Sequence, residues 1–281
     1  FVAAATLASL SGAGNTTFSS DATITGGISA GTINVTGALS SAISGGTVNA
    51  ASLTGNISGA ATTTIAGLTN GTIAGTGTLS SGSLSSTSVT GGTNTITGAA
   101  TVTTVNGGTT TVGGVATITS LTTGTLTFNG ASGSIGTLTA GTFNLNGAAA
   151  TVGTLSAGTI NLAASTALTV DSGTFSGSLA GSGSLIKATS GILTLTGANA
   201  SFTGATTISL GELIIQNAGS LGTSAITVAS GAILDLNNIG ITNAITVASG
   251  GIIENGPTAA SPAVVAALSG TNSIIDRKSV V

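Results

Sequence analysis

Six acidic residues and one lysine carry nearly all the acid–base chemistry open to this 281-residue chain. The sequence contains no His, Cys or Tyr, which excludes catalysis by imidazole, thiol or phenol. General acid–base catalysis needs a titratable pair within reach of a substrate. The acids are scattered, and Lys187 is the single base before residue 276, so we predict no catalytic and no cofactor-binding residue. The acids are Asp21, Asp171, Glu212, Asp235, Glu254 and Asp276.

Asp235 and Glu254 are the one acidic pair whose spacing matches an internal repeat. The heptapeptide AITVASG occurs at residues 225–231 and again at 244–250, and the two acids are separated by the same interval as the two copies. They should lie on neighbouring repeats and, because each follows an apolar residue, point outward. Two adjacent carboxylates could hold Ca²⁺, which prefers oxygen ligands, but two are too few for a dedicated site. We expect a solvated acidic pair and no metal site.

Charge is scarce in the whole chain. Only 3% of the residues are charged, whereas a globular domain has about 25%, and the formal net charge is −3. A nucleic-acid partner is excluded because a phosphate-binding surface needs clustered Lys and Arg. No apolar run approaches the roughly 20 residues of a membrane-spanning helix, so we expect no membrane span.

The elements that must position the polar residues are strands, not helices. The chain has 46 Gly and is rich in Thr and Val, which rank low in helix propensity. Thr, Val and Ile suit the pleated surface of a sheet. Disorder is the rival interpretation, since Gly- and Ser-rich chains often stay unfolded. The 41% of hydrophobic residues, regularly spaced, favours a folded chain.

A constant interval relates three successive segments of equal length, 116–132, 133–149 and 150–166. Similarity at a fixed period is typical of repeat architectures. Two of the aligned apolar columns alternate with a single polar position between them, which is the spacing of side chains on one face of a strand. The columns predicted to be buried are Ile118/Ile135/Val152, Leu121/Leu138/Leu155, Leu126/Phe143/Ile160 and Phe128/Leu145/Leu162.

One such repeat is too short to bury a core alone and must stack on its neighbours. Each residue then lies about 4.8 Å from its equivalent in the next coil. A column formed by Gly124, Gly141 and Gly158 predicts corners where φ is positive. The predicted fold is all-β, a single-stranded parallel β-solenoid with coils of about 17–20 residues and strands of roughly three to six residues.

Polar columns should lie outside this core. Asn144 and Asn161 stack one coil apart and should form a hydrogen-bonded ladder. A threonine column beside them would suit the ordering of water or ice only with a second threonine column next to it. Thr127 begins a second column, but the two asparagines follow it, so we expect that column to fail after one coil. The first column consists of Thr125, Thr142 and Thr159.

Short strand motifs bounded by glycine recur after residue 183. They read GSLIK at 183–187, GILTLTGAN at 191–199 and ITVASGAILDL at 226–236. With these motifs, residues 183–255 resemble the autotransporter passenger-associated repeat, also called the autotransporter-associated β-strand repeat. The turn at 200–202 departs from the family pattern by one extra residue. The resemblance implies a right-handed β-helix, export across a bacterial envelope and display on the cell surface, and it brings no catalytic residues.

We predict four segments: coils with degenerate repeats of about 15–25 residues at 1–182, family-like coils at 183–255, an irregular coil at 256–275 and a non-native tail at 276–281. The tail, DRKSVV, holds two of the three basic residues. The codons GAT-CGG-AAG-AGC-GTC-GTG would encode it and match a common sequencing adapter; a genuine polar tail is the alternative. Residues 1–10 are either the end of a signal peptide's apolar region or the first strand.

These features lead us to expect a non-catalytic stalk or adhesin. It would be secreted, or displayed on a bacterial cell and anchored in the outer membrane through a part outside this sequence. The alternative is a solenoid that binds ice or carbohydrate through a Thr-rich face, and a third is a fragment of a polysaccharide-active enzyme. Expected partners are an unknown surface ligand or a neighbouring cell. End-to-end self-association is also expected, because solenoid ends expose unpaired strand edges.

Overall fold

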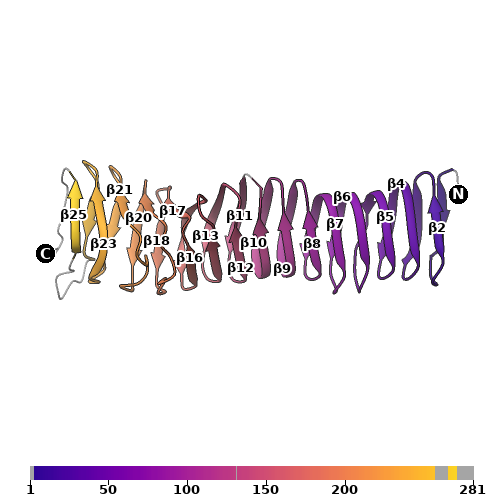
Figure 1. The fold of residues 1–281 in the computed structure, drawn as a ribbon, viewed down its shortest axis with the longest axis horizontal. Helices are drawn as coiled ribbons and strands as arrows, with labels where there is room; N and C mark the ends of the chain where they lie inside the picture. The colour runs from indigo at the N-terminus through magenta and orange to yellow at the C-terminus, as the bar shows by residue number, and fades with distance from the viewer. Residues whose placement is uncertain (1–2, 131, 257–264, 271–281) are drawn as a thin grey trace. The chain divides into compact units, whose positions relative to one another are not determined.

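The computed structural model describes residues 3–130, 132–256 and 265–270. The chain divides into two compact units, Phe1–Gly133 and Ser134–Val281. Every described element is a β-strand, and Figure 1 shows these strands following one another without an intervening helix. The predicted all-β class is confirmed. No helix able to cross a membrane occurs among the described residues.

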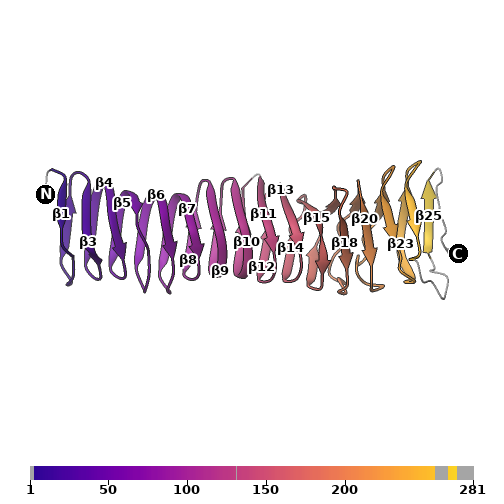
Figure 2. The ribbon, with the colours of Figure 1, turned by 180° about the vertical axis from the view of Figure 1, so that it is seen from behind.

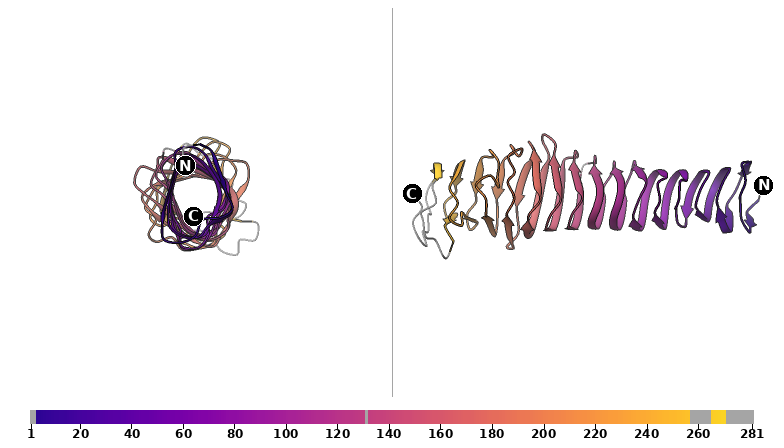
Figure 3. Two further views of the ribbon diagram at one scale, coloured as in Figure 1. Left: turned by 90° about the vertical axis from the view of Figure 1, so that its right-hand side faces the viewer. Right: turned by 90° about the horizontal axis from the view of Figure 1, so that it is seen from below.

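In the first unit, parallel strands of successive turns lie side by side (Figure 2; Figure 3, right). Thr93 of β8 pairs with Thr109 of β9, which in turn pairs with Thr125 of β10. This pairing of each strand with its equivalent one turn later confirms the predicted parallel solenoid. The strands are β1 (Ala5–Leu7), β2 (Asn15–Phe18), β3 (Ala22–Ile28), β4 (Thr32–Ile43), β5 (Thr47–Thr54), β6 (Thr62–Ile73), β7 (Thr78–Val89), β8 (Thr93–Ile96), β9 (Ala100–Val112) and β10 (Ala116–Phe128).

Most turns of this unit fall within the repeats of about 15–25 residues predicted for 1–182, although several are shorter than the general estimate of about 17–20, and its strands are longer than predicted. Hydrogen bonds between successive turns join residues 15 to 18 positions apart. The strands β9 and β10 each have 13 residues, against a predicted three to six. The physical reason is that the β9–β10 ladder continues around a corner, with register shifts on either side of Thr123, where separate strands were expected.

In the second unit the turns lengthen along the chain. Asn161 bonds to Asn144 across 17 residues, and Thr246 bonds to Ser269 across 23. Strand pairing is again parallel, as in β12 with β14 and β22 with β24. The strands are β11 (Ser132–Leu138), β12 (Thr142–Leu145), β13 (Ala149–Leu155), β14 (Thr159–Leu162), β15 (Ala167–Phe175), β16 (Ser178–Gly181), β17 (Ser184–Lys187), β18 (Ile192–Leu195), β19 (Thr206–Ile208), β20 (Glu212–Ile215), β21 (Ile226–Val228), β22 (Ile233–Asp235), β23 (Ile241–Val247), β24 (Ile252–Glu254) and β25 (Val265–Gly270).

The core of each unit consists mainly of apolar columns that run from turn to turn, but one column of the first unit also holds the buried Thr63, Asn94 and Thr110. All twelve residues predicted to be interior are buried, and none is more than 2% exposed. Phe143 pairs in register with Ile160, as the alignment of the three repeated segments predicts. Burying a Leu, Ile or Phe side chain contributes about 1.5–3 kcal/mol, so these columns supply much of the stability of a turn.

The predicted glycine column is confirmed as a row of corners. Gly124, Gly141 and Gly158 have φ values of 80°, 85° and 103°. A Cβ atom on Gly158 would lie 2.6 Å from the carbonyl oxygen of Gly141. Only glycine fits there, because the positive φ and the close approach of the preceding turn both exclude a side chain.

Candidate functional site

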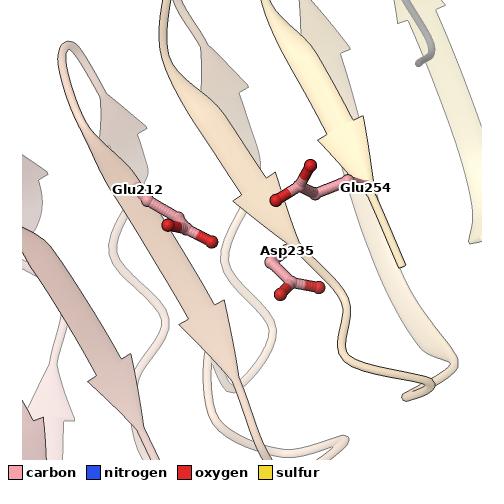
Figure 4. A group of neighbouring side chains, drawn as sticks. All are labelled: Glu212, Asp235 and Glu254. Carbon is pink, nitrogen blue, oxygen red and sulfur yellow. The ribbon is translucent and has the colours of Figure 1, made fainter. Parts of the chain in front are cut away.

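The densest group of ionisable side chains in the described structure lies on one face of β20, β22 and β24 in the second unit. Glu212, Asp235 and Glu254 come from these three neighbouring strands, and their carboxylate oxygens lie within 4.8 Å of one another. Figure 4 shows Glu212 and Glu254 reaching toward each other across the strand that carries Asp235.

Strand register accounts for the cluster. Asp235 pairs with Glu254, which confirms the predicted stacking on neighbouring turns. Glu212 was not predicted to join them, because β20 places Ile214, two positions further along, opposite Asp235. Glu212 is therefore a diagonal neighbour on the same face, and its longer side chain closes the gap. A search for acids at this diagonal offset would have found it in the sequence.

Asp235 is only 5% exposed, so the expectation that both acids of the pair are solvated was wrong for this residue. The turn after β22 causes the burial: the Asn237 amide donates to Asp235 Oδ1 at 2.7 Å. Asn237 and Asn238 both have positive φ, 44° and 65°, a conformation that asparagine tolerates better than most residues. Glu212 and Glu254 are half-buried at the rim.

The electrostatics of the cluster are unbalanced. Burial raises the pKa of the Glu212 carboxyl, and the Glu254 and Asp235 charges and a hydrogen bond to Glu254 raise it further. The chain's one base before residue 276, Lys187, is turned into the core rather than toward these acids. The arrangement can share a proton and attract a cation. Three carboxylates are fewer than the roughly six to eight oxygen ligands that Ca²⁺ takes, so backbone or water oxygens would have to complete such a site.

Lys187 occupies a core position, which the sequence analysis did not foresee. It is fully buried and pairs in register with Val170 and Ile208, so it belongs to an otherwise apolar column. Its ammonium donates to the Thr189 carbonyl and, at 3.3 Å, to the Leu210 carbonyl. Burial lowers the pKa of the Lys187 ammonium, and the Asp171 charge partly offsets this shift.

The other acids form no second cluster in the described structure. Asp21 accepts a hydrogen bond from the Ala38 amide at 2.8 Å and so ties two turns of the first unit together. Asp171 lies near Lys187 in the second unit. Asp276, with the rest of the predicted tail, lies outside the described residues.

Hydroxyl columns on the outside of the first unit are longer than predicted. The second threonine column does not fail after one coil: Thr95, Thr111 and Thr127 pair in register over three turns. The prediction counted threonines only from Thr125 and Thr127 onward and therefore missed those of the earlier turns, several of which are shorter than the aligned interval. The first column is threonine at every one of seven turns: Thr32, Thr47, Thr62, Thr78, Thr93, Thr109 and Thr125.

Two amide ladders also lie on outer faces. Asn161 Nδ2 donates to Asn144 Oδ1 at 2.7 Å, which confirms the predicted ladder. In the first unit, Asn49 Nδ2 donates to Asn34 Oδ1 at 2.9 Å, a pair that the sequence analysis did not single out.

Comparison with known proteins returns no match: no family model, no curated protein and no solved structure is similar to this chain.

Proposed function

We propose that the chain is a non-catalytic β-solenoid, secreted or displayed on a bacterial surface, that acts as a stalk or adhesin. The observation that supports this most is the contrast between the two sides of each turn. Apolar columns fill the core, while Thr, Ser and Asn columns face outward in register with hardly any charge. Such a surface offers many weak, uncharged hydrogen bonds over successive turns, and the described residues contain a single cluster of acids, Glu212, Asp235 and Glu254.

The resemblance of residues 183–255 to the autotransporter passenger-associated repeat supports the surface location. The two AITVASG copies fall on β21 and β23 and pair in register, with Ile226 opposite Ile245 and Val228 opposite Val247. The sequence repeat is thus a structural repeat of the solenoid. The right-handed sense of the coil and its export are part of the same proposal.

Antibody labelling tests the location. Immunogold particles carrying an antibody to the purified chain should decorate the outside of intact cells that produce it. An antibody to a cytosolic enzyme is the control and should label only permeabilised cells. Label confined to the cytoplasm would overturn the proposal.

A second candidate function, the ordering of water or ice, is favoured by the paired threonine columns of the first unit. Strands about 4.8 Å apart with side chains alternating along them present a two-dimensional lattice of hydroxyl groups. In this interpretation Thr93 and Thr109 belong to one column and Thr95 and Thr111 to the next. A stalk without ice-binding activity would show the same threonine ladders. Only a measurement of ice-binding activity can therefore distinguish the two functions.

Thermal hysteresis measures this second function directly. The double variant Thr93→Lys/Thr109→Lys should abolish any freezing-point gap, because two long cations interrupt the lattice. The matched control is Thr103→Lys/Thr119→Lys, which changes two exposed threonines of β9 and β10 outside these columns. A parent chain with no thermal hysteresis would eliminate this candidate.

A further inference from the structure

Four strands of the second unit, β18, β20, β22 and β24, pair side by side and form one parallel sheet. Where β12 and β14 carry threonine and asparagine on the outside, these strands carry isoleucines and acids. We call this surface the isoleucine–acid face. Its outward side chains form two columns, Ile192/Glu212/Ile233/Ile252 and Thr194/Ile214/Asp235/Glu254.

The isoleucines of this face leave apolar surface exposed to solvent. Ile192 is 49% exposed, and Leu210, at the corner that leads into β20, is 46% exposed. Ile214, Ile233 and Ile252 are half-buried, while the alternate residues of the same strands fill the core. Exposed apolar side chains gathered beside polar groups are typical of a surface that binds a partner.

The charges of the face lack a counter-charge among the described residues. Oxygens of Glu212, Asp235 and Glu254 lie within 4.8 Å of one another, and Figure 4 shows no base between them. Lys187 is the one base before residue 276, and its side chain is fully buried in the core. Like charges this close repel one another, so a cation bound here relieves the repulsion.

These two properties restrict the class of partner. A metal ion or a polyamine would neutralise the acids but leave the isoleucines exposed. A neutral apolar segment would cover the isoleucines but desolvate the acids without pairing them, which is costly. Nucleic acid and anionic lipid are repelled by the carboxylates. A protein segment that alternates aliphatic with basic side chains satisfies both properties, because the stems of Lys and Arg also cover apolar surface.

We propose that the isoleucine–acid face docks a basic segment of another protein, in which Lys or Arg alternates with aliphatic residues. The basic groups pair with Glu212 and Glu254 at the rim of the cluster, and the aliphatic side chains cover Ile192, Ile214 and Ile233. This docking goes beyond the stalk or adhesin proposed above and holds wherever the chain is located.

A labelled peptide tests the docking. The probe is fluorescein-labelled Ile-Arg-Ile-Lys-Ile with an amidated end, and fluorescence anisotropy during titration with the full chain measures its binding. The peptide should bind at low ionic strength, and its affinity should fall about tenfold in about 0.5 M NaCl, because salt screens the charge pairs. Two comparator peptides, one with serine in place of isoleucine and one with glutamate in place of both basic residues, should bind at least about tenfold more weakly.

Two variants separate charge from apolar contact. Glu212→Gln/Glu254→Gln removes two charges at nearly constant volume and should weaken binding about tenfold. Ile192→Thr keeps a β-branched residue in β18 and should weaken binding severalfold, because it removes exposed apolar surface. The matched control is Ile186→Thr, an outward isoleucine of β17 whose neighbours on β15 and β19 are both threonine. It should leave binding within about twofold of the parent.

The docking is overturned if the parent does not bind the peptide, if the serine peptide binds as tightly, or if Ile186→Thr weakens binding as much as Ile192→Thr. Binding of Ca²⁺ or spermidine without binding of the peptide would also overturn it, since the acids would then serve a small cation. Because none of these outcomes affects surface labelling, the proposed stalk is tested separately.

Discussion

The first unit spaces its turns 14 to 18 residues apart and carries one charged side chain, Asp21. The second lengthens its turns to as many as 23 residues and holds a lysine and four acids within its described residues. The core of each unit is mainly apolar, although the first unit also buries Thr63, Asn94 and Thr110. The units therefore differ in the length of their turns and in the number of charged side chains that these turns carry.

Longer turns bring backbone groups inside that no neighbouring strand can satisfy, and the second unit satisfies them with buried amides. Asn199 accepts from the Leu179 amide at 2.7 Å and donates to the Ser220 carbonyl at 2.6 Å. Asn243 donates to the Ser224 carbonyl at 2.8 Å. The first unit has a buried amide too: Asn94 donates to the Gly91 carbonyl at 3.1 Å, whereas its Asn34–Asn49 pair lies on an outer face. Buried amides therefore satisfy backbone groups in both units, and in the second unit they also join the longer turns.

A charge introduced into the core should lower the unfolding free energy of both units equally. We expect this to be the largest of the predicted effects. Leu121→Asp in the first unit and Leu138→Asp in the second should each cost several kcal/mol of unfolding free energy, because the carboxylate is buried without a partner. Denaturant unfolding followed by circular dichroism measures this cost. Thr139→Asp, next to Leu138 but exposed, is the control and should stay within about 0.5 kcal/mol of the parent. If Leu138→Asp unfolds like the parent, the column assignment is wrong.

Removal of an amide side chain should lower the unfolding free energy by different amounts in the two units. Asn199→Ala should lower the unfolding free energy by about 2 kcal/mol, because a buried amide and a buried carbonyl both lose their partner. Asn49→Ala removes an outer ladder bond and should cost less than about 1 kcal/mol, since water replaces it. Equal costs in the same unfolding assay would refute the difference expected between a buried amide and an amide on an outer face.

Lys187 tests whether the polar core contacts of the second unit are needed for stability. Lys187→Met should raise the unfolding free energy by about 1 kcal/mol, because it removes a buried ammonium and keeps an apolar chain of similar length. Lys187→Ala should instead destabilise the unit, because it leaves a cavity. A destabilised methionine variant would show that the bonds to the Thr189 and Leu210 carbonyls outweigh the cost of burying the charge.

The acidic cluster of the second unit gives the smallest effect and a pH dependence of stability. Because folding raises the pKa of Glu212, the folded state holds its proton more tightly, and stability is lost as pH rises from about 4.5 through the raised pKa. Glu212→Gln should remove this loss and raise the melting temperature at pH 7 by about 2 °C. Melting curves at pH 4 and pH 7 measure it. An unchanged slope in the variant would assign the pH dependence to another group.

Sequence periodicity was enough to predict the fold and the core but not the site. The columns through Leu138 and Phe143 and the corner at Gly141 follow from the constant interval between three successive repeats. Glu212 was missed because turn length changes between β20 and β22, so that equal spacing no longer identifies neighbours. Lys187 was missed for another reason: lysine is rarely buried, and only the register of β17 reveals that its position faces inward.

The inward position of Lys187 has a consequence for proteolysis. Trypsin-like proteases recognise a Lys or Arg side chain in a pocket with a carboxylate at its base. Residues 1–186 contain no such side chain, and the next one after Lys187 is Arg277. Because the Lys187 side chain is fully buried, a protease of this class can cleave there only after the turn around β17 opens. The folded solenoid therefore withstands trypsin-like digestion up to Arg277 for as long as that one turn stays closed.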